Sequence, residues 1–203
     1  MSELKTLIFD LGGVVLSEDD SVLFQSDFLN TFNINASTVA EGWRAGWNDF
    51  KIGKITENMF WDILLKTAGA HPIDITKAKN LWRNHAYEND HMFSLLKNLQ
   101  KYYTLGVLSN IGKEHFDYKW KHFNLDRYFT FFVASGYEAI AKPDLAIYEL
   151  LLKKIGIPSQ ECLFIDNLEI NLLPAKQLGM KTILFQTQNK LETQLRSMGI
   201  RYE

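Results

Sequence analysis

The sequence of 203 residues contains one cysteine and four prolines, and it has no hydrophobic run long enough to cross a bilayer. A single cysteine, Cys162, excludes a disulfide within the chain and fits a reducing compartment. Its place in an apolar run favours a small buried side chain over a nucleophile. The amino terminus leads directly into an expected strand, without the apolar segment of a signal peptide. These absences predict a cytoplasmic protein that does not bind a membrane.

Strong charge of either sign is also missing. The formal net charge is -2, and no block of lysine and arginine stands out. The sequence therefore gives no sign of the basic surface patch with which proteins bind nucleic acid. The Gly-x-Gly-x-x-Gly pattern of dinucleotide-binding Rossmann domains is absent as well. The length suits one domain, or a core with one insertion, and the apolar content is sufficient for a buried core.

Short apolar runs rich in Leu, Ile, Val and Phe alternate with helical patterns along most of the chain. Such runs are typical of strands that are buried on both faces of a parallel sheet. We expect Asp90 and Asp144 to cap two of the helices. We also expect the helix after Asp166 to start late, so that Pro174 lies in its first turn. This alternation predicts a doubly wound α/β fold, with strands at residues 5–9, 104–108, 130–134, 162–165 and 181–185.

One connection is far too long for a simple loop. About 75 residues separate Val15 from Met92, so this segment is expected to fold on its own. Apolar residues recur at helical spacing from Val22 to Phe32, and two further helices are expected after Thr56 and Asp74 as capping residues. The chain therefore contains a helical insertion between its first and second strands.

Polar residues follow three of the expected strands at the point where each strand ends. Asp10 ends the first apolar run, Ser109 and Asn110 follow the second strand, and Asp166 follows a later one, with Lys142 between them in the sequence. Ligands of open α/β sheets bind at this edge. A carboxylate nucleophile, a hydroxyl, an ammonium and a second carboxylate are the groups that phosphoryl transfer to an aspartate requires.

These residues, in this order, resemble the haloacid dehalogenase (HAD) superfamily. The first motif, Phe9-Asp10-Leu11-Gly12-Gly13-Val14, resembles the branch that contains sugar-phosphate phosphatases. Further matches are Lys142-Pro143-Asp144 with Ile147-Tyr148, and Asp166 with Asn171, Ala175 and Gly179. The resemblance implies a Rossmann-like core of residues 1–15 and 93–203 with a helical cap of residues 16–92. It also implies Mg²⁺-dependent hydrolysis of a small phosphorylated metabolite, possibly a sugar phosphate, by a monomer or homodimer.

The resemblance assigns roles to individual residues. Asp10 is the expected nucleophile, and Lys142 neutralises the phosphoryl charge and keeps Asp10 ionised. Ser109 binds a phosphoryl oxygen, although a serine at this place can also simply cap the next helix. The expected catalytic residues are thus Asp10, Ser109 and Lys142. The substrate contacts are Gly12, Gly13, Ser109, Asn110 and Lys142, and the Mg²⁺ ligands are Asp10, the Gly12 carbonyl and Asp166.

Two positions depart from the pattern of the family's phosphatases. Gly12 stands where a second aspartate usually serves as general acid and base, and loss of such a group typically costs about 10²–10⁴ in rate. Asn167 stands where the branch often has another aspartate, so weaker Mg²⁺ binding is expected. These departures leave two alternatives open: a metal-independent 2-haloacid dehalogenase-type hydrolase, and a degenerate, non-catalytic binding protein.

The remaining polar and aromatic residues give weaker predictions. The histidines lack metal-ligand spacing and are interpreted as surface or capping residues: His71, His85, His91, His115 and His122. The acidic stretch Glu18-Asp19-Asp20 is interpreted as a solvated turn. A group in the insertion can either select the substrate or form the insertion's own core, which is the commoner role of aromatic residues at helical spacing: Trp43, Arg44, Trp47, Phe50 and Lys54.

Overall fold

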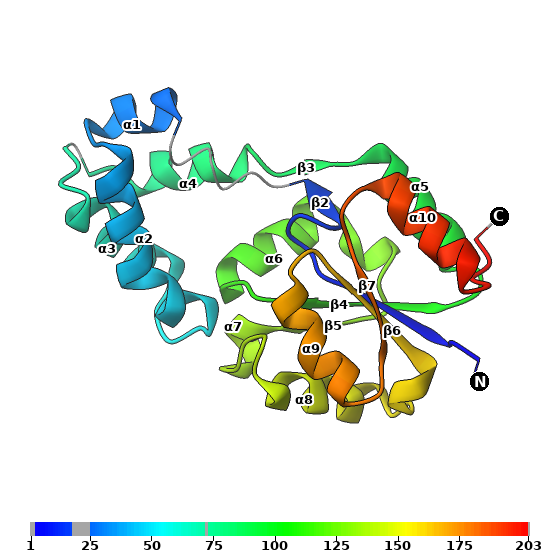
Figure 1. Cartoon of the computed structure of the whole chain (residues 1–203). Coiled ribbons are helices and arrows are strands. Elements are labelled where there is room, and N and C mark those ends of the chain that lie inside the picture. The colour runs from blue at the N-terminus through cyan, green and yellow to red at the C-terminus, as the bar shows by residue number, and fades with distance from the viewer. Residues whose placement is uncertain (1–2, 18–24, 72, 203) are drawn as a thin grey trace.

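The computed structural model describes residues 3–17, 25–71 and 73–202, and its centre is a five-stranded sheet with the order β5-β4-β1-β6-β7 (Figure 1). Every pair of neighbouring strands is parallel. The strand positions agree with the sequence prediction to within one residue. Their bounds are Thr6–Phe9 (β1), Thr104–Ser109 (β4), Phe131–Ala134 (β5), Cys162–Asp166 (β6) and Lys181–Leu184 (β7).

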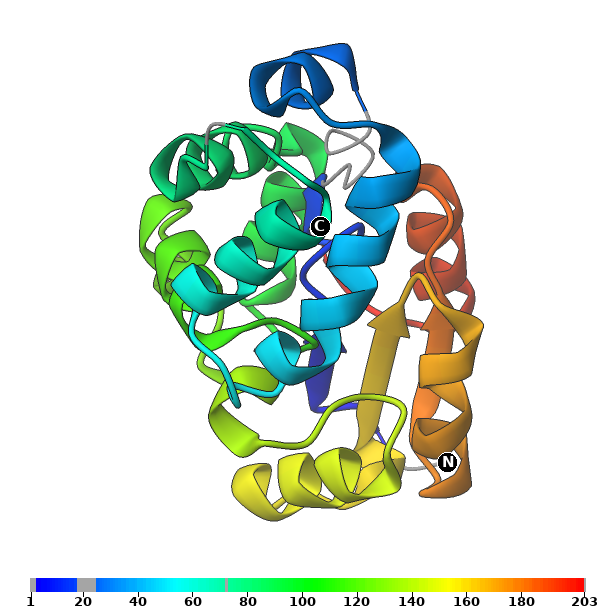
Figure 2. The ribbon, with the colours of Figure 1, turned by 90° about the vertical axis from the view of Figure 1, so that its left-hand side faces the viewer.

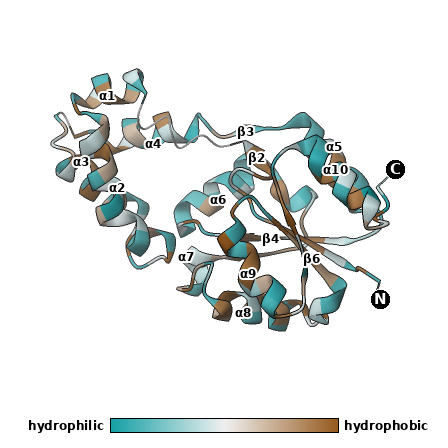
Figure 3. Ribbon diagram, viewed as in Figure 1, coloured by the Kyte–Doolittle hydropathy of each residue, from teal (hydrophilic) through white to brown (hydrophobic). Residues whose placement is uncertain are grey.

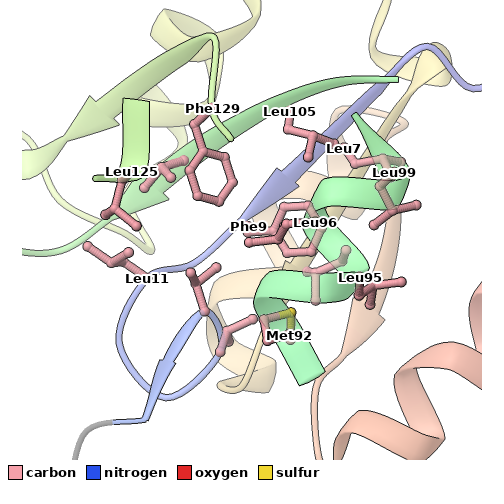
Figure 4. Close-up of a cluster of buried hydrophobic side chains, with 14 of the residues drawn as sticks. Leu7, Phe9, Leu11, Met92, Leu95, Leu96, Leu99, Leu105, Leu125 and Phe129 are labelled. Carbon is pink, nitrogen blue, oxygen red and sulfur yellow. The ribbon is translucent and has the colours of Figure 1, made fainter. Parts of the chain in front are cut away.

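Both faces of the sheet are buried, which explains the continuous apolar runs. Side chains alternate between the faces of a strand, and in β1 Leu7 and Phe9 pack into one hydrophobic cluster whereas Ile8 packs into another. Figure 4 shows Leu7 and Phe9 against Leu96 and its neighbours on one face. The strands are coloured as hydrophobic in Figure 3, and hydrophilic residues lie along the surrounding helices.

Helices cover both faces. The cluster of Phe9 receives residues of α5 (Asp90–Leu99), α6 (Lys113–His122) and α10 (Gln188–Ser197). The cluster of Ile8 receives residues of α8 (Leu145–Ile155) and α9 (Glu169–Gln177). The short helix α7 (Ser135–Glu138) follows β5, and two 3₁₀ turns occupy Leu125–Arg127 and Ser159–Glu161. The predicted doubly wound α/β fold is confirmed.

In its described residues, the insertion contains four helices, which we call the cap: α1 (Ser26–Phe32), α2 (Ala36–Lys51), α3 (Glu57–Thr67) and α4 (Ile75–Arg83). They have their own hydrophobic cluster, in which Phe28, Phe60 and Trp61 are fully buried. Figures 1 and 2 show these helices beside the sheet domain, connected to it by two strands of the chain. Those strands, Leu16–Ser17 (β2) and Tyr87–Glu88 (β3), form an antiparallel pair.

The division of the chain at residues 15 and 92 remains a prediction. However, α5 begins at Asp90, and Met92 packs in the cluster of the sheet, so residues 90–92 lie with the core rather than with the cap. The expected caps Thr56, Asp74 and Asp144 are confirmed, because each side chain accepts a backbone hydrogen bond at its helix start. No helix within the described ranges combines the length and apolarity needed to span a membrane.

Two local predictions, the cap of α5 and the place of Pro174, differ from the structure. Asn89, not Asp90, caps α5, since its side chain accepts from the amides of His91 and Met92. Pro174 lies well inside α9, which starts at Glu169. Proline has no backbone N–H, so residue 174 cannot donate the helical hydrogen bond to the carbonyl of Ile170. The predicted helical residues Val22 to Phe24 lie outside the described residues, as does the Glu18-Asp19-Asp20 turn.

The cap and the core touch at the end of α2. The Ser135 hydroxyl donates to the carbonyl of Lys51 and accepts from the amide of Ile111. The ring of Phe50 lies against Gly112, where a Cβ atom would be only 2.3 Å from it. Gly53 has a φ of 72°, and a Cβ there would be 2.2 Å from the carbonyl oxygen of Gly136. Glycine at 53 therefore permits this close approach.

Candidate active site

A cavity of about 300 Å³ opens between the carboxyl ends of the central strands and the cap. This is the edge at which open α/β sheets bind ligands. Asp10 follows β1, Ser109 ends β4, and Asp166 ends β6, so neighbouring strands deliver these groups side by side. The cavity is lined on the core side by Asp10, Gly12, Gly13, Ser109, Asn110, Lys142 and Asn167.

Lys142 is the centre of this arrangement. Its Nζ atom lies 3.0 Å from Oδ1 of Asp10 and 2.6 Å from Oδ2 of Asp166, and it donates to the carbonyl of Leu108 at 2.9 Å. The lysine is 3% exposed, Asp10 8% and Asp166 fully buried. One ammonium group therefore joins two carboxylates that follow adjacent parallel strands.

The backbone of Lys142 is fixed by Asn110. The side-chain amide of Asn110 donates to the carbonyl of Lys142, and its oxygen accepts from the amide of Lys142, both at 2.8 Å. We predicted that Asn110 helps to hold phosphoryl oxygens. This role stays a prediction: Asn110 lines the cavity, and its side chain also positions the backbone of Lys142.

The carboxylate of Asp166 is held by hydrogen bonds from residues that follow it in the chain. Its Oδ1 atom accepts from the amide of Leu168 at 2.8 Å, and the side chain of Asn171 donates to both carboxylate oxygens at 3.1 Å. The carbonyl of Asn171 in turn accepts from the hydroxyl of Tyr148 at 2.6 Å. Asn171 therefore orients the carboxylate of Asp166.

The electrostatics of the site are dominated by burial. Removal from water raises the pKa of Asp10, the ammonium of Lys142 opposes this change, and the carboxylate of Asp166 adds to it. Two carboxylates share one ammonium here, so an additional cation would favour the ionised form of Asp10. Burial also raises the pKa of the Cys162 thiol to about 11, which agrees with the predicted inert, buried residue.

Gly13 and Asn167 fit against each other. Gly13 has a φ of 73°, and a Cβ at this position would lie 2.6 Å from Nδ2 of Asn167. A side chain is thus excluded by both the backbone conformation and the neighbouring amide. The turn is closed by a hydrogen bond from the amide of Gly13 to the carbonyl of Leu16. Gly12 and Gly13 consequently bring bare backbone to the cavity next to Asp10.

The oxygen donors at this edge are suited to a hard cation. Within the described part of the chain, no cluster of three or more His, Cys, Asp or Glu side chains could hold a metal. The two carboxylates of Asp10 and Asp166 and the carbonyl of Gly12 nevertheless form the kind of set that Mg²⁺ uses, in which water and substrate oxygens complete the coordination. The donor chemistry fits the predicted ligands.

The cap side of the cavity was only partly anticipated. Trp47 of α2 and Trp82 of α4 line it, together with His115 and Lys119 of α6. The interpretation of His115 as a surface or capping residue is wrong, because it is 2% exposed and its ring stacks on Trp82 at 3.9 Å. His71, His91 and His122 are exposed, as predicted. His115 and Lys119 are one turn apart on the helix that follows the Ser109 loop, which is the signal that could have found them.

The other candidates in the cap do not line the cavity. Trp43 stacks on Trp47, and Phe50 stacks on Phe60 within the cap's own cluster. Arg44 donates to the carbonyl of Ala40 on the surface, and exposed Lys54 pairs with Asp49. Five cap residues were considered for substrate selection. Within the part of the chain that the structure describes, Trp47 alone of these five lines the cavity.

Comparison with protein families gives a match over most of the chain. The model of a haloacid dehalogenase-like hydrolase matches residues 7–185. The sesquiterpene phosphatase astK of Aspergillus oryzae is 29% identical over 180 residues, which cover 87% of each protein. The drimenol cyclase drtB of Aspergillus calidoustus is 25% identical over 197 residues, but this match covers 95% of the present chain and 36% of that relative.

Solved structures show the same fold. A HAD family enzyme from Bacteroides thetaiotaomicron superposes with a TM-score of 0.81 and 25% identity, over 91% of this chain and 95% of that chain. The same bacterial enzyme in complex with magnesium and inorganic phosphate gives a TM-score of 0.77 and 24% identity, over 90% and 94% of the two chains. The sheet domain and the helical insertion therefore both have counterparts of known structure.

Proposed function

Because the chain belongs to the haloacid dehalogenase-like hydrolase family, we propose that it hydrolyses a small phosphomonoester through an aspartyl-phosphate on Asp10, with Mg²⁺ as cofactor. The observation that supports this most directly is the ammonium of Lys142 between the carboxylates of Asp10 and Asp166 in the cavity. A carboxylate beside a buried ammonium, at the ligand-binding edge of the sheet, can attack phosphorus and have the developing charge neutralised.

In the first step, a carboxylate oxygen of Asp10 forms a bond to phosphorus, and the bond from phosphorus to the leaving oxygen breaks. Lys142 faces the developing charge, and its backbone is held in place by Asn110. Ser109, which is 3% exposed and lines the cavity, donates its hydroxyl to a phosphoryl oxygen. In the second step, water attacks phosphorus, phosphate leaves, and the carboxylate of Asp10 is regenerated.

Asp10, Asp166 and the carbonyl of Gly12 would hold the Mg²⁺. When bound, the cation supplies charge neutralisation at the phosphoryl oxygens. Asn171 keeps the carboxylate of Asp166 in place for this role. Asn167 has an amide where a carboxylate would add a further negative charge, so the site is expected to fill mainly when substrate oxygens complete it.

Proton delivery is the unusual part of the proposed reaction. Gly12 has no side chain with which to protonate the leaving oxygen, so the proton comes from water. This favours substrates whose leaving group departs without strong assistance. It also makes the exclusion of bulk water by the cap important, because the aspartyl-phosphate must survive until the hydrolytic water attacks.

The test is a panel of phosphorylated metabolites assayed for phosphate release, including sugar phosphates and an isoprenyl phosphate. Release is expected with Mg²⁺ and should fall by about 100-fold or more in chelator, because the cation contributes several kcal/mol of charge stabilisation. Excess Mg²⁺ should restore it. Asn167→Asp should lower the Mg²⁺ concentration required for half-maximal rate.

Two outcomes would overturn the proposal. Release of halide from 2-haloacids, with no effect of chelator, would assign the chain to dehalogenation. An absence of turnover across the panel, with ligand binding retained, would indicate a non-catalytic binding protein.

A further inference from the structure

Tyr148 is a buried polar residue to which the proposed mechanism gives no role. It lies on α8, it is fully buried, and it packs in the hydrophobic cluster of Ile8 on one face of the sheet. The described residues that line the cavity do not include it. A phenylalanine would fill the same apolar space without a hydroxyl that has to find a hydrogen-bond partner. The hydroxyl of Tyr148 therefore requires its own explanation.

This hydroxyl reaches the start of α9. It donates to the carbonyl of Asn171 at 2.6 Å, in the first turn of that helix. The same turn has one helical hydrogen bond fewer than usual, because Pro174 has no N–H to donate to the carbonyl of Ile170. The bond from Tyr148 thus ties a weakened turn of α9 to the neighbouring helix α8.

Asn171 connects this turn to the site. Its side chain donates to both carboxylate oxygens of Asp166 at 3.1 Å. The amide of Leu168 donates to Oδ1 of the same carboxylate at 2.8 Å, and the ammonium of Lys142 lies 2.6 Å from Oδ2. The carboxylate cannot turn without breaking at least one of these contacts. Its orientation therefore depends on where the backbone at Asn171 lies.

The ring of Tyr148 makes a second, separate contact near the site. It packs edge-on against Phe164, with the ring centres 5.9 Å apart. The ammonium of Lys142 lies 5.4 Å from the centre of the Phe164 ring. Tyr148 is thus connected to the site by two routes, and the one through Asn171 is the route that needs the hydroxyl. Replacement of Tyr148 by phenylalanine removes that route and keeps the ring.

The hydroxyl is also a constant donor. Burial, together with the negative charges of Asp166 and Asp10, raises the pKa of Tyr148. The side chain therefore stays protonated at every pH of an ordinary assay. Its bond to the carbonyl of Asn171 should persist throughout, so the effect of removing it should not depend on pH.

We propose that Tyr148 is a positioning residue for the cation site: its hydroxyl, acting through Asn171, holds the carboxylate of Asp166 in the orientation that binds Mg²⁺. Groups that hold a metal ligand in place typically contribute about 10- to 100-fold to metal affinity. Tyr148 is one step further from the ligand, so the lower end of this range is expected. This inference rests on the proposed phosphatase function and assigns a part in it to α8.

The experiment measures cation binding directly, on the full chain, by electron paramagnetic resonance of Mn²⁺ in the presence of inorganic phosphate. Mn²⁺ prefers the same oxygen ligands as Mg²⁺, and phosphate supplies the oxygens that complete the site. Tyr148→Phe should weaken the binding of Mn²⁺ by about 10-fold. In turnover, the Mg²⁺ concentration for half-maximal rate should rise by a similar factor, and excess Mg²⁺ should restore most of the rate.

Tyr202→Phe is the matched control. Tyr202 is 7% exposed and packs in the hydrophobic cluster on the other face of the sheet, and its hydroxyl donates to the carbonyl of Glu192 at 3.4 Å. Loss of this hydroxyl should leave Mn²⁺ binding at the wild-type value. Thermal unfolding of both variants separates a general loss of stability from an effect on the cation site.

The order of the residues is tested by Asn171→Ala and by the double variant. Asn171→Ala should weaken Mn²⁺ binding at least as much as Tyr148→Phe, because Asn171 makes the contact with Asp166. Addition of Tyr148→Phe to Asn171→Ala should cause no further loss, since the hydroxyl acts through that side chain. Additive losses would show that Tyr148 acts by another route, and a smaller loss in Asn171→Ala than in Tyr148→Phe would contradict the proposed order.

Failure of this inference differs from failure of the proposed function. If the wild type hydrolyses p-nitrophenyl phosphate with Mg²⁺, and Tyr148→Phe binds Mn²⁺ as tightly as the wild type, Tyr148 only fills space and the proposed function stands. If the wild type binds no Mn²⁺ in the presence of phosphate and releases no phosphate with Mg²⁺, the proposed function itself is wrong, and this inference falls with it.

Discussion

The two sides of the cavity are held together in different ways. On the core side, Asp10, Lys142 and Asp166 are joined by short contacts between charged groups, and backbone groups of Leu108, Leu11 and Leu168 complete the arrangement. On the cap side, contacts between the two units include the stacking of Trp82 on His115 and the approach of Glu57 to that ring. The core side is thus a network of ion pairs and hydrogen bonds at one edge of the sheet. The cap side is an interface in which side chains of two units pack together.

This difference separates chemistry from selection. Asp10 and Asp166 directly follow Phe9 and Ile165, which are paired in the parallel sheet, so the register of the sheet fixes the spacing of the two carboxylates. The cap-side groups depend on how the cap helices α3 and α4 pack against α6, and we expect that a change in the cap can alter them without disturbing Asp10. We infer that disruption of the core side should abolish turnover, whereas changes on the cap side should alter which substrate is bound.

The largest expected effect is that of Asp10→Asn. An amide is a poor nucleophile, so the rate of phosphate release should fall by about 10⁴-fold or more. The fold should persist, because the substitution keeps the shape and removes one of two carboxylates that compete for Lys142. Steady-state kinetics on the best substrate of the panel, together with thermal unfolding, measures both. A near-native rate of phosphate release in this variant would exclude the aspartyl-phosphate mechanism.

Lys142→Met tests how far the core-side network supports the fold. The substitution leaves Asp10 and Asp166 buried without their ammonium, and loss of one partner of a buried ion pair typically costs about 3–5 kcal/mol. Urea unfolding at neutral pH should show a loss of this size. Lys153→Met, at an exposed position of α8, is the control and should stay within about 0.5 kcal/mol of the wild type. Equal stability of both variants would mean that the network serves catalysis alone.

The same contrast explains what the sequence could predict. The five strands and Asp10, Ser109 and Asp166 at their ends were predictable, because a continuous apolar run followed by a polar residue reflects the covalent order of the chain. Thr56 and Asp74 as helix caps were equally local signals. In each case the residues that determine the structure are close in sequence.

The remaining features depend on contacts between distant segments. His115 looked like a surface residue, and it is buried only because Trp82, more than thirty positions earlier in the chain, stacks on it. The contact of Asn110 with the phosphoryl group stays a prediction, but its two hydrogen bonds to the backbone of Lys142, 32 positions later, were not anticipated. Pro174 was placed in a first turn because its position gives no sign that α9 begins at Glu169. Contacts between distant segments, which periodicity does not encode, explain the first two.

A smaller effect is expected from the titration of His115. In the unfolded chain a histidine binds a proton near pH 6.5, whereas folded His115 has a lowered pKa because of burial and the surrounding cations. Between these two pKa values the unfolded state binds more protons. The free energy of unfolding should therefore decrease as the pH falls below about 6.5, by up to about 1.4 kcal/mol per pH unit. Above that pH, His115 should cause no change of stability with pH.

Urea unfolding from pH 7.5 downward, in the wild type and in His115→Gln, measures this dependence. As the pH falls below about 6.5, the variant His115→Gln should lose less stability per pH unit than the wild type. His122→Gln, at an exposed position of the same helix, should behave like the wild type. The groups that face His115 are Glu57, Lys79, Trp82, Arg83, Tyr118 and Lys119. Parallel curves for all three proteins would show that His115 does not contribute to the pH dependence.

The smallest expected change is a shift of the cap when the phosphate end of the cavity is filled. Trp43, Trp47, Trp61 and Trp82 belong to the cap, and Trp120 is the single tryptophan elsewhere, so intrinsic fluorescence reports mainly on the cap. The contact of Trp82 with His115 makes that signal sensitive to the cap–core interface. Closure over a bound phosphoryl group would exclude water from the aspartyl-phosphate.

Addition of Mg²⁺ and beryllium fluoride, a phosphoryl mimic that bonds to carboxylates, should therefore change the fluorescence of the wild type. Asp10→Ala should not respond, since the mimic has no carboxylate to bond. The hydrogen bond of Ser135 to Lys51 and the contact of Phe50 with Gly112 hold the end of α2 on the core, so the expected movement is a small rotation about this contact rather than a separation. If structures with and without the mimic show one cap orientation, the cavity is rigid, and the cap-side residues select the substrate by shape and charge alone.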